Sequence, residues 1–376
     1  MSLRILLVAS LHHPQQLLRD QAAARENDVP LPLFPTSMSQ HFWEKALRKR
    51  GYEVDVFWRN LPGFGGREVA NLQAEKYTER ITPERVWMAL NARLPYTLNV
   101  EYRQRNQNLL QQAEAFQPDI VWMVGDNRII HADTLAAIKA RHGSKILYVT
   151  GTSPIVFSLP IERQAAALYD LVLVNDYYHG IQWLELGAQE MICLPFVAID
   201  PEFHVARQPL PEDRCDIGFV GTLLPANLYS ERVQALESLR GFDLGIWSVH
   251  DLPETLRPFQ RGSALGEEML RVLSAAKISL NVHGNFMRYG GNMRLFEAAA
   301  VGAFQLVDDR PGVRQWFTEG EHLVMYESLD DLREKAAYYL AHDEERERIS
   351  AAGRAHVLAH HTSEQRLDAL ETWLST

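Results

Sequence analysis

The sequence predicts an α/β protein with two doubly wound, Rossmann-like parallel-sheet domains, and three observations support this prediction. The chain has 376 residues, of which 46% are hydrophobic, so it can bury the cores of two or three domains of about 100–200 residues each. Short apolar runs alternate with polar-faced helical segments, as is typical of a parallel sheet covered on both faces. A proline-rich stretch at 195–214 separates two such series and is the predicted linker.

The first series contains six short, β-rich runs that predict buried parallel strands. They lie at 5–9, 52–58, 120–124, 146–149, 171–174 and 191–194. A helix predicted at 39–50 ends at Gly51, because glycine favours helix ends. The alternation of strands and helices is interrupted at about 59–108. This segment is too long for a simple crossover connection. We therefore expect a helical insertion there.

The second series follows the linker. Its predicted strands lie at 216–221, 242–247, 278–282 and 303–307, and its predicted helices at 230–239, 265–276 and 292–301. Capping patterns that begin at Ser328 and Thr362 start two more helices. The expected domains are therefore 1–200 and 213–361, followed by a C-terminal helix at 362–376 that can cross back to the N-terminal domain.

Composition excludes several classes of protein. The net charge of −10 argues against binding nucleic acid or an anionic membrane. Cys193 and Cys215 are too few for a disulfide framework and too isolated for a metal site, which predicts a reducing, cytoplasmic environment. No apolar stretch approaches the roughly 20 residues that span a bilayer, so we expect no membrane span.

Common cofactor and catalytic motifs are missing from the sequence. It has no GxxxxGK[ST], no HExxH and no GxSxG, and no GxGxxG follows the first strand, where Ala9-Ser10-Leu11 stands. A dinucleotide dehydrogenase is therefore not expected. The sequence also has no Asp-x-Asp, which removes the usual carboxylate pair for Mg²⁺ on a nucleotide sugar. We predict no metal site.

The densest group of candidate residues lies at 281–302, where a strand, a glycine-containing loop and a helix follow one another. Gly290 and Gly291 allow close approach of a ligand to the backbone, and the first N–H groups of the helix favour an anion. Arg294 in the first turn could bind a diphosphate in bidentate fashion, and Glu297 could accept both hydroxyls of a ribose. The alternative is an ordinary glycine turn, with Arg294 and Glu297 paired on the helix surface.

At this point the sequence resembles a known family. The segment 218–366 is similar to the glycosyltransferase group 1 domain of the spore-maturation CgeB-like proteins, within the GT-B superfamily. The residues that carry the resemblance are Phe219-Val-Gly221-Thr222, Ser274 to His283, Gly291-Asn-Met-Arg294-Leu-Phe-Glu297, Gly302 to Asp308, and His361-Thr362 with Arg366. The linker from Pro195 to Phe203 resembles the interdomain segment of GT-B enzymes. The first half resembles the family mainly in its strand order, and in sequence only at Pro118-Asp119-Ile120-Val121.

The resemblance implies two facing Rossmann-like domains with a cleft between them, the acceptor bound by the first and a nucleotide-sugar donor by the second. It also implies metal-independent catalysis and no permanently bound cofactor. Carried over to this sequence, the resemblance implies that Glu297 binds the ribose, and that Asn292 and Arg294 hold the diphosphate together with the Gly290-Gly291 backbone. It also implies that Gly221 and Thr222 contact the donor at the tip of the first strand of this domain, and that Trp247 and Ser248 lie beside the base. Trp247 could equally pack in the core.

Two departures from the family leave the stereochemistry of the reaction open. Retaining members often carry a second glutamate eight positions before Glu297, where Tyr289 stands here. They also often carry a histidine after the strand that here leads to Gly151-Thr152-Ser153. The catalytic roles of the first half therefore cannot be transferred directly.

Four residues are candidates for catalysis. Asp126 follows a strand end and could be a base, or could cap the next turn. His13, next to His12, could also be a base, or could simply be solvated. His283 could donate to a phosphate or a sugar hydroxyl, or could satisfy the loop around it. Arg294 would stabilise the departing diphosphate.

The sequence as a whole predicts a glycosyltransferase that moves a sugar from a nucleoside-diphosphate donor, a UDP-sugar in the first place, to an undetermined acceptor. That acceptor could be a saccharide, a small molecule or a protein. One alternative is a nucleotide-sugar epimerase of the same fold, which would release free sugar without an acceptor. The other is a non-catalytic protein that binds nucleotide sugars or has a structural role.

Overall fold

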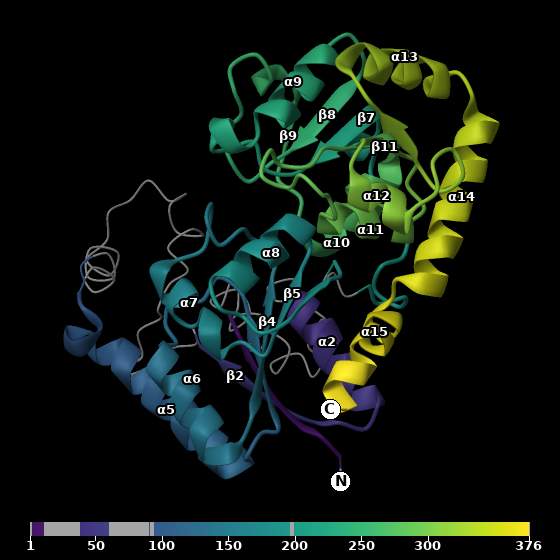
Figure 1. Cartoon of the computed structure of the whole chain (residues 1–376). Helices are drawn as coiled ribbons and strands as arrows, with labels where there is room; N and C mark the ends of the chain where they lie inside the picture. Colours follow the sequence, from purple (N-terminus) through teal and green to yellow (C-terminus); the bar gives the residue numbers. More distant parts are fainter. Residues whose placement is uncertain (1, 11–37, 60–89, 91–93, 196–198, 376) are drawn as a thin grey trace, which may run out of the picture. The chain divides into compact units, whose positions relative to one another are not determined.

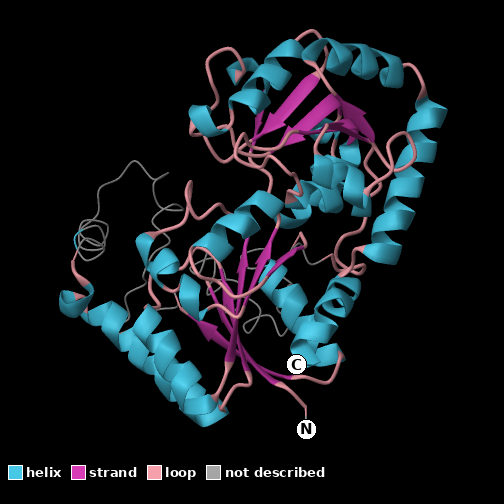
Figure 2. Ribbon diagram, in the orientation of Figure 1, coloured by secondary structure: helices cyan, strands magenta, loops and turns pink. Residues whose placement is uncertain are grey.

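The computed structural model describes residues 2–10, 38–59, 90, 94–195 and 199–375. The chain divides into two compact units, Met1–Cys193 and Leu194–Thr376 (Figure 1). Each unit contains one sheet of six parallel strands flanked by helices (Figure 2). The predicted α/β fold with two doubly wound sheets is confirmed.

The sheet of the first unit has the order β2-β1-β3-β4-β5-β6. Its strands are β1 Arg4–Ala9, β2 Glu53–Trp58, β3 Ile120–Val124, β4 Lys145–Thr150, β5 Leu171–Val174 and β6 Met191–Cys193. Its helices are α2 Met38–Lys49, α5 Val100–Phe116, α6 Ala132–His142, α7 Pro160–Gln164 and α8 Tyr177–Glu185. The central strands are buried on both faces, which explains why they are continuous apolar runs rather than alternating ones.

The sheet of the second unit has the order β12-β11-β10-β7-β8-β9. Its strands are β7 Cys215–Val220, β8 Leu244–Trp247, β9 Gln260–Gly262, β10 Ala276–Asn281, β11 Gln305–Asp308 and β12 Val324–Tyr326. Its helices are α9 Ser230–Ser238, α10 Gly266–Ala275, α11 Met293–Ala300, α12 Pro311–Trp316, α13 Leu329–Leu340, α14 Asp343–His360 and α15 Ser363–Ser375. Short 3-10 helices lie at Tyr96–Leu98, Ala166–Leu168, Pro211–Asp213, Ala226–Leu228 and Arg257–Phe259.

Most predicted elements are present with small shifts at their ends. The strand predicted at 303–307 runs from Gln305 to Asp308, so Asp308 is its last residue. The strand predicted from 242 begins at Leu244. The short strands β9 and β12 were not predicted, because β9 is a polar edge strand and β12 has only three residues. The helices α5 to α8, α12 and α14 were not predicted individually. Within the expected insertion, residues 60–89 and 91–93 lie outside the described residues.

Both predicted capping patterns are present. The Ser328 side chain accepts a hydrogen bond from the Asp331 N–H at the start of α13, and the Gln365 side chain accepts one from the Thr362 N–H at the start of α15. Backbone pairing of Ile199 with Thr362 ties the beginning of α15 to the segment that follows β6. Among the described residues, no helix is both long and apolar enough to cross a membrane.

Each sheet has one point where the strand order reverses. In the first unit it lies between β1 and β3, and in the second between β7 and β10. Ligands of open α/β sheets bind at such a switch point, outside the carboxyl ends of the strands. The functional residues should therefore lie just after these four strands.

Candidate functional site

The loop after β10 leads into α11 through two glycines with backbone conformations that other residues rarely adopt. Gly290 has φ +97° and Gly291 has φ +114°. A Cβ on Gly290 would lie 2.9 Å from the Arg310 Cβ, so the loop can pack this closely only with glycine at this position. The glycines therefore fix the loop against the segment that follows β11.

Asn292 is the N-cap of α11. Its Oδ1 accepts a hydrogen bond from the Leu295 N–H at 3.1 Å, and its Nδ2 donates to Asn281 Oδ1 at 2.8 Å. The side chain thus supports the helix start. The N–H groups of Met293 and Arg294 have no acceptor within the helix, because the first turn of any helix lacks one, and such a terminus favours a bound anion.

Arg294 and Glu297 form an ion pair one turn along α11. Arg294 Nη1 lies 2.6 Å from Glu297 Oε2, and the two side chains are only 21% and 7% exposed. Arg294 Nε donates to the Val220 carbonyl at 3.4 Å, at the carboxyl end of β7. The pair therefore lies at the switch point and not on the solvated helix surface that the simpler alternative assumed. No hydrogen bond between described residues engages Glu297 Oε1, which can accept hydroxyl groups.

His283 supports the glycine loop from beneath. Its imidazole is fully buried, and its Nδ1 lies 2.7 Å from Asp308 Oδ1. Its Nε2 accepts the Gly291 N–H at 3.1 Å, so the proton of the neutral ring is on Nδ1. Both nitrogens are engaged, so the structure does not present His283 to a ligand as a donor. Of the two roles predicted for His283, the structure favours satisfying the loop, and the group satisfied is an amide.

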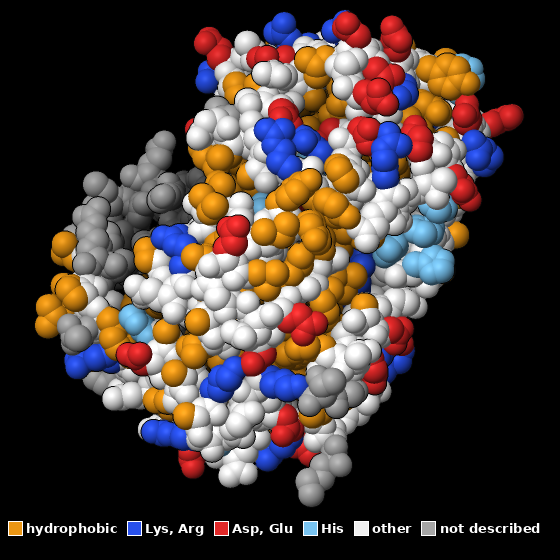
Figure 3. All heavy atoms as spheres, viewed as in Figure 1, with side chains coloured by type: hydrophobic (Ala, Val, Ile, Leu, Met, Phe, Trp, Pro, Cys, Tyr) orange, Lys and Arg blue, Asp and Glu red, His pale blue; other side chains and the backbone are white. Residues whose placement is uncertain are grey.

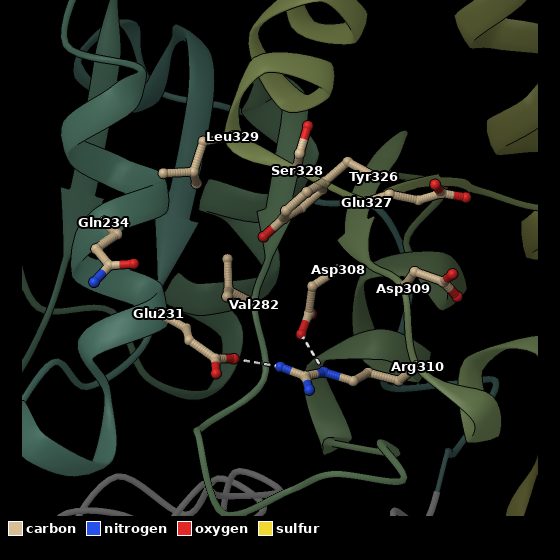
Figure 4. A pocket seen from close by; sticks show the side chains of 10 residues that line it. All are labelled: Glu231, Gln234, Val282, Asp308, Asp309, Arg310, Tyr326, Glu327, Ser328 and Leu329. Atoms are coloured by element: carbon tan, nitrogen blue, oxygen red, sulfur yellow. Dashed lines mark hydrogen bonds and ion pairs between the residues drawn. The ribbon is translucent and has the colours of Figure 1, made fainter.

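Asp308 connects this loop to a pocket. Burial would raise the pKa of Asp308, but its contacts with His283 and Arg310 hold that pKa well below its usual range. Arg310 Nε donates to Asp308 Oδ2 at 2.7 Å, and Arg310 also pairs with Glu231 at the start of α9. Asp308, Arg310 and Glu231 line a pocket of about 590 Å³ at the ends of β10, β11 and β12. The Tyr326 ring and Leu329 lie across from them (Figure 4).

The end of β7 is held by an arginine that the sequence analysis missed. Arg232 on α9 donates from Nη1 to the Thr222 carbonyl at 2.9 Å and from Nε to the Val282 carbonyl at 2.7 Å. One guanidinium thus bridges the carboxyl ends of β7 and β10 across the switch point. Its two acceptors are 10 and 50 residues away in the sequence, so no local pattern could have revealed the contact.

Trp247 is the last residue of β8 and Ser248 follows it, and both residues are buried. The Gly221 N–H donates to the Trp247 carbonyl at 3.0 Å, which brings the ends of β7 and β8 together. The indole is 4% exposed and packs on the backbone of Gly245. The Ser248 Oγ accepts a hydrogen bond from the His250 N–H. The structure therefore places the Trp247 ring in the core, the second of its predicted positions.

In the first unit, Asp126 stands exposed just beyond β3. Its φ of +58° is unusual for a residue other than glycine, and such strain is frequent at functional sites. Asp126 does not cap the next helix, because Asn127 forms the turn by accepting the N–H groups of Ile129 and Ile130 and the N-cap of α6 is His131.

The chain on both sides of Asp126 is held by buried charges. Arg59 is 1% exposed and donates to the Val124 carbonyl at 2.5 Å and to the Gly125 carbonyl. Glu162 accepts the Asn127 N–H at 2.8 Å. The backbone on both sides of the exposed Asp126 carboxylate is therefore held by hydrogen bonds to buried side chains. The other candidate base of this unit, His13, lies outside the described residues.

Comparison with known proteins finds relatives of the second unit and solved structures with the same fold. A family model described as glycosyl transferase-like matches residues 230–372, which include the glycine loop, α11 and the Arg294–Glu297 pair. The chain matches sucrose-phosphate synthase from Thermosynechococcus elongatus, with a TM-score of 0.62 and 12% identity over 99% of each chain. Residues 230–372 thus resemble the glycosyl transferase-like family, as the sequence predicted, and the chain has the fold of the matched structure.

Two further similarities point in the same direction. The chain is 26% identical over 275 residues to the spore protein CgeB of Bacillus subtilis, a match that covers 65% of this chain and 78% of CgeB. HepE of Anabaena, solved in complex with UDP-glucose, matches with a TM-score of 0.57 and 13% identity over 99% of this chain and 100% of HepE. Among the described residues, no three His, Cys, Asp or Glu side chains come together as metal ligands.

Proposed function

We propose that this protein is a glycosyltransferase that transfers a sugar from a UDP-sugar to an acceptor held by the first unit. The observation that carries the proposal is the arrangement at the carboxyl end of β7. There the start of α11, which favours an anion, lies next to the Arg294–Glu297 pair. These two features suit the two polar parts of a nucleoside diphosphate, its phosphates and its ribose. The complex of HepE with UDP-glucose supports the same donor class.

Each group at the start of α11 has a defined part in donor binding. The free amides and the Arg294 guanidinium hold the diphosphate and stabilise the charge that grows on it as the bond from sugar to phosphate breaks. Glu297 Oε1 accepts the ribose hydroxyls. Gly221 leaves room for the Phe219 ring at the carboxyl end of β7, because a Cβ at position 221 would lie 3.0 Å from that ring. Asn292, His283 and Asp308 hold the loop in place.

The acceptor must lose a proton during transfer. In an inverting reaction the acceptor oxygen attacks the anomeric carbon, the bond from that carbon to the phosphate oxygen breaks, and UDP departs with the electron pair. We assign the acceptor proton to the Asp126 carboxylate, which is exposed at a strand end and rigidly supported. The products are then the glycosylated acceptor, UDP and protonated Asp126.

The reaction is proposed to need no divalent metal. The sequence has no Asp-x-Asp, and the positive charge for the leaving group can come from Arg294 and the helix start. A cytoplasmic location is part of the proposal and is supported by the low cysteine content, since the sequence has only Cys193 and Cys215.

A donor-turnover assay tests this function. The full chain is incubated with a panel of UDP-sugars, with and without candidate saccharide, small-molecule and protein acceptors, in EDTA or in Mg²⁺. Release of UDP that requires an acceptor and persists in EDTA is the expected result, and Arg294→Ala should abolish it. Arg240→Ala, at an exposed position after α9, is the matched control. Free sugar without acceptor would indicate an epimerase, and binding without turnover would indicate a non-catalytic protein.

A further inference from the structure

The pocket of the second unit lies on the opposite face of the sheet from α11. β7 leads to β8 in one direction along the sheet and β10 leads to β11 in the other, so right-handed connections place α9 and α11 on opposite faces. α13 packs on α9, and the pocket lies between the N-terminal ends of these two helices (Figure 4). Among the described residues that line it, none belongs to α11. The pocket is therefore separate from the proposed donor site.

The carboxylates of the pocket are mostly paired with arginines. Arg310 Nε lies 2.7 Å from Asp308 Oδ2, and Arg310 also pairs with Glu231. Both oxygens of Asp309 accept hydrogen bonds from Arg314 at 2.7 Å. Because these carboxylates outnumber the one arginine that lines the pocket, they repel an anion such as a phosphate. Because they are paired, they attract a cation only weakly.

Several polar groups of the pocket remain available to a ligand. Tyr326 is 6% exposed, and its hydroxyl points into the middle of the pocket (Figure 4). No hydrogen bond between described residues engages this hydroxyl, the Gln234 amide or the Glu327 carboxylate. A hydroxyl that is largely withdrawn from water favours a ligand that can bond it. The amide and the carboxylate supply further donors and acceptors at the rim, where both residues are exposed.

This lining suits an uncharged, polyhydroxylated ring. Sugar hydroxyls both donate and accept hydrogen bonds, so they can bond the carboxylate oxygens, the amide and the Tyr326 hydroxyl together. Val282, Leu329 and the Tyr326 ring supply apolar surface for the C–H groups of such a ring. A wholly apolar ligand would leave the polar groups without partners. The volume of about 590 Å³ lies within the range of small-molecule sites.

We propose that this pocket binds a neutral sugar unit of a saccharide acceptor, with the Tyr326 hydroxyl as its central hydrogen-bonding group. The inference rests on the proposed function, because it names the acceptor class that the sequence left open. Asp308 lines the pocket and also bonds His283 beneath the glycine loop, so a saccharide in the pocket lies next to the proposed donor site. The competing interpretations are that the pocket holds the sugar of the donor or only water.

Direct measurement of saccharide binding tests this proposal without any need for turnover. The full chain is screened on an array of neutral oligosaccharides of glucose, galactose, mannose and N-acetylglucosamine and of uronic-acid oligosaccharides. The strongest neutral ligand is then titrated by calorimetry. Neutral saccharides should bind, and their uronic-acid counterparts should bind at least about tenfold more weakly. Tyr326→Phe removes one hydroxyl and should weaken neutral-saccharide binding about fivefold. Tyr338→Phe, at an exposed tyrosine of α13, is the matched control and should bind like the wild type.

The outcomes are distinct. Absence of saccharide binding by the wild type, or equal affinities of the wild type and Tyr326→Phe, would overturn the proposal. If UDP-glucose abolishes saccharide binding whereas UDP does not, the pocket holds the donor sugar and the proposal is likewise overturned. If the melting temperature shows that Tyr326→Phe does not fold, Gln234→Ala at the exposed rim takes its place with the same expectation. Saccharide binding without any turnover of UDP-sugars would contradict the proposed function but not the sugar site, and turnover without an effect of Tyr326→Phe would do the reverse.

Discussion

Acidification should destabilise the second unit through His361, at the junction of α14 and α15. Histidine side chains gather on the surface over α14 (Figure 3), and His361 is the buried member of this group, at 8% exposure. Its Nε2 lies 3.2 Å from His356 Nε2. Burial, together with the positive charge of Arg366 and the neighbouring His356 and His360, lowers the pKa of His361 to about 3.

The sign and size of the effect follow from proton linkage. An unfolded histidine has a pKa of about 6.5, so between pH 6.5 and 3 the unfolded chain binds a proton that folded His361 does not bind. The free energy of unfolding therefore falls as the pH falls through this window, by about 1.4 kcal/mol per pH unit below the unfolded pKa. Between pH 7 and pH 5 the loss attributable to this residue is about 2 kcal/mol.

Urea unfolding at pH 7 and pH 5, followed by circular dichroism, measures this loss. His361→Gln removes the titrating group, so the variant should lose about 2 kcal/mol less than the wild type over this range. His342→Gln, at an exposed histidine of the same unit, should behave like the wild type. Equal pH dependence of the wild type and His361→Gln would refute the reasoning.

Three more predictions follow from the packing. His283→Ala removes the acceptor of the Gly291 N–H, so hydrogen exchange of that amide should accelerate at least about tenfold and UDP affinity should fall; unchanged exchange would contradict the supporting role. Arg59→Met leaves buried carbonyls without a donor and should destabilise the first unit by about 3 kcal/mol in urea unfolding. Gly245→Ala places a Cβ 2.7 Å from a buried indole and should cost about 1–3 kcal/mol, whereas Gly241→Ala, with open space around it, should be neutral.

Much of the fold could be predicted because its signals are local. Strands such as β3 and β5 are continuous apolar runs with the bounds that the sequence predicts, since both of their faces are covered. The start of α11 was also predictable, because the glycine pair, the N-cap Asn292 and the first-turn Arg294 are neighbours in sequence. Short or polar elements such as β9 gave no such signal, because their pairing depends on an edge that other strands create.

The candidate site was only partly predictable. The sequence identified the glycine loop, Arg294 and Glu297, but left open whether the ion pair was buried and whether His283 faced a ligand. Burial depends on what packs over α11, and the orientation of His283 depends on Asp308, which is 25 residues away. The position of the Trp247 ring likewise depends on its neighbours, Gly245 two residues earlier in β8 and Gly218 on the adjacent strand β7.

The sequence by itself determined the two α/β units, the order of most strands and helices, and the strand, glycine loop and helix on which the donor site is proposed. Tertiary structure alone decided which charges meet there. Arg232 reaches two strand ends, Arg59 reaches the carbonyls before Asp126, and Asp308 joins the glycine loop to the pocket. The physical reason is that parallel strands bring residues from distant parts of the chain to one sheet edge, and electrostatic contacts at that edge depend on distance in space and not on spacing in the sequence.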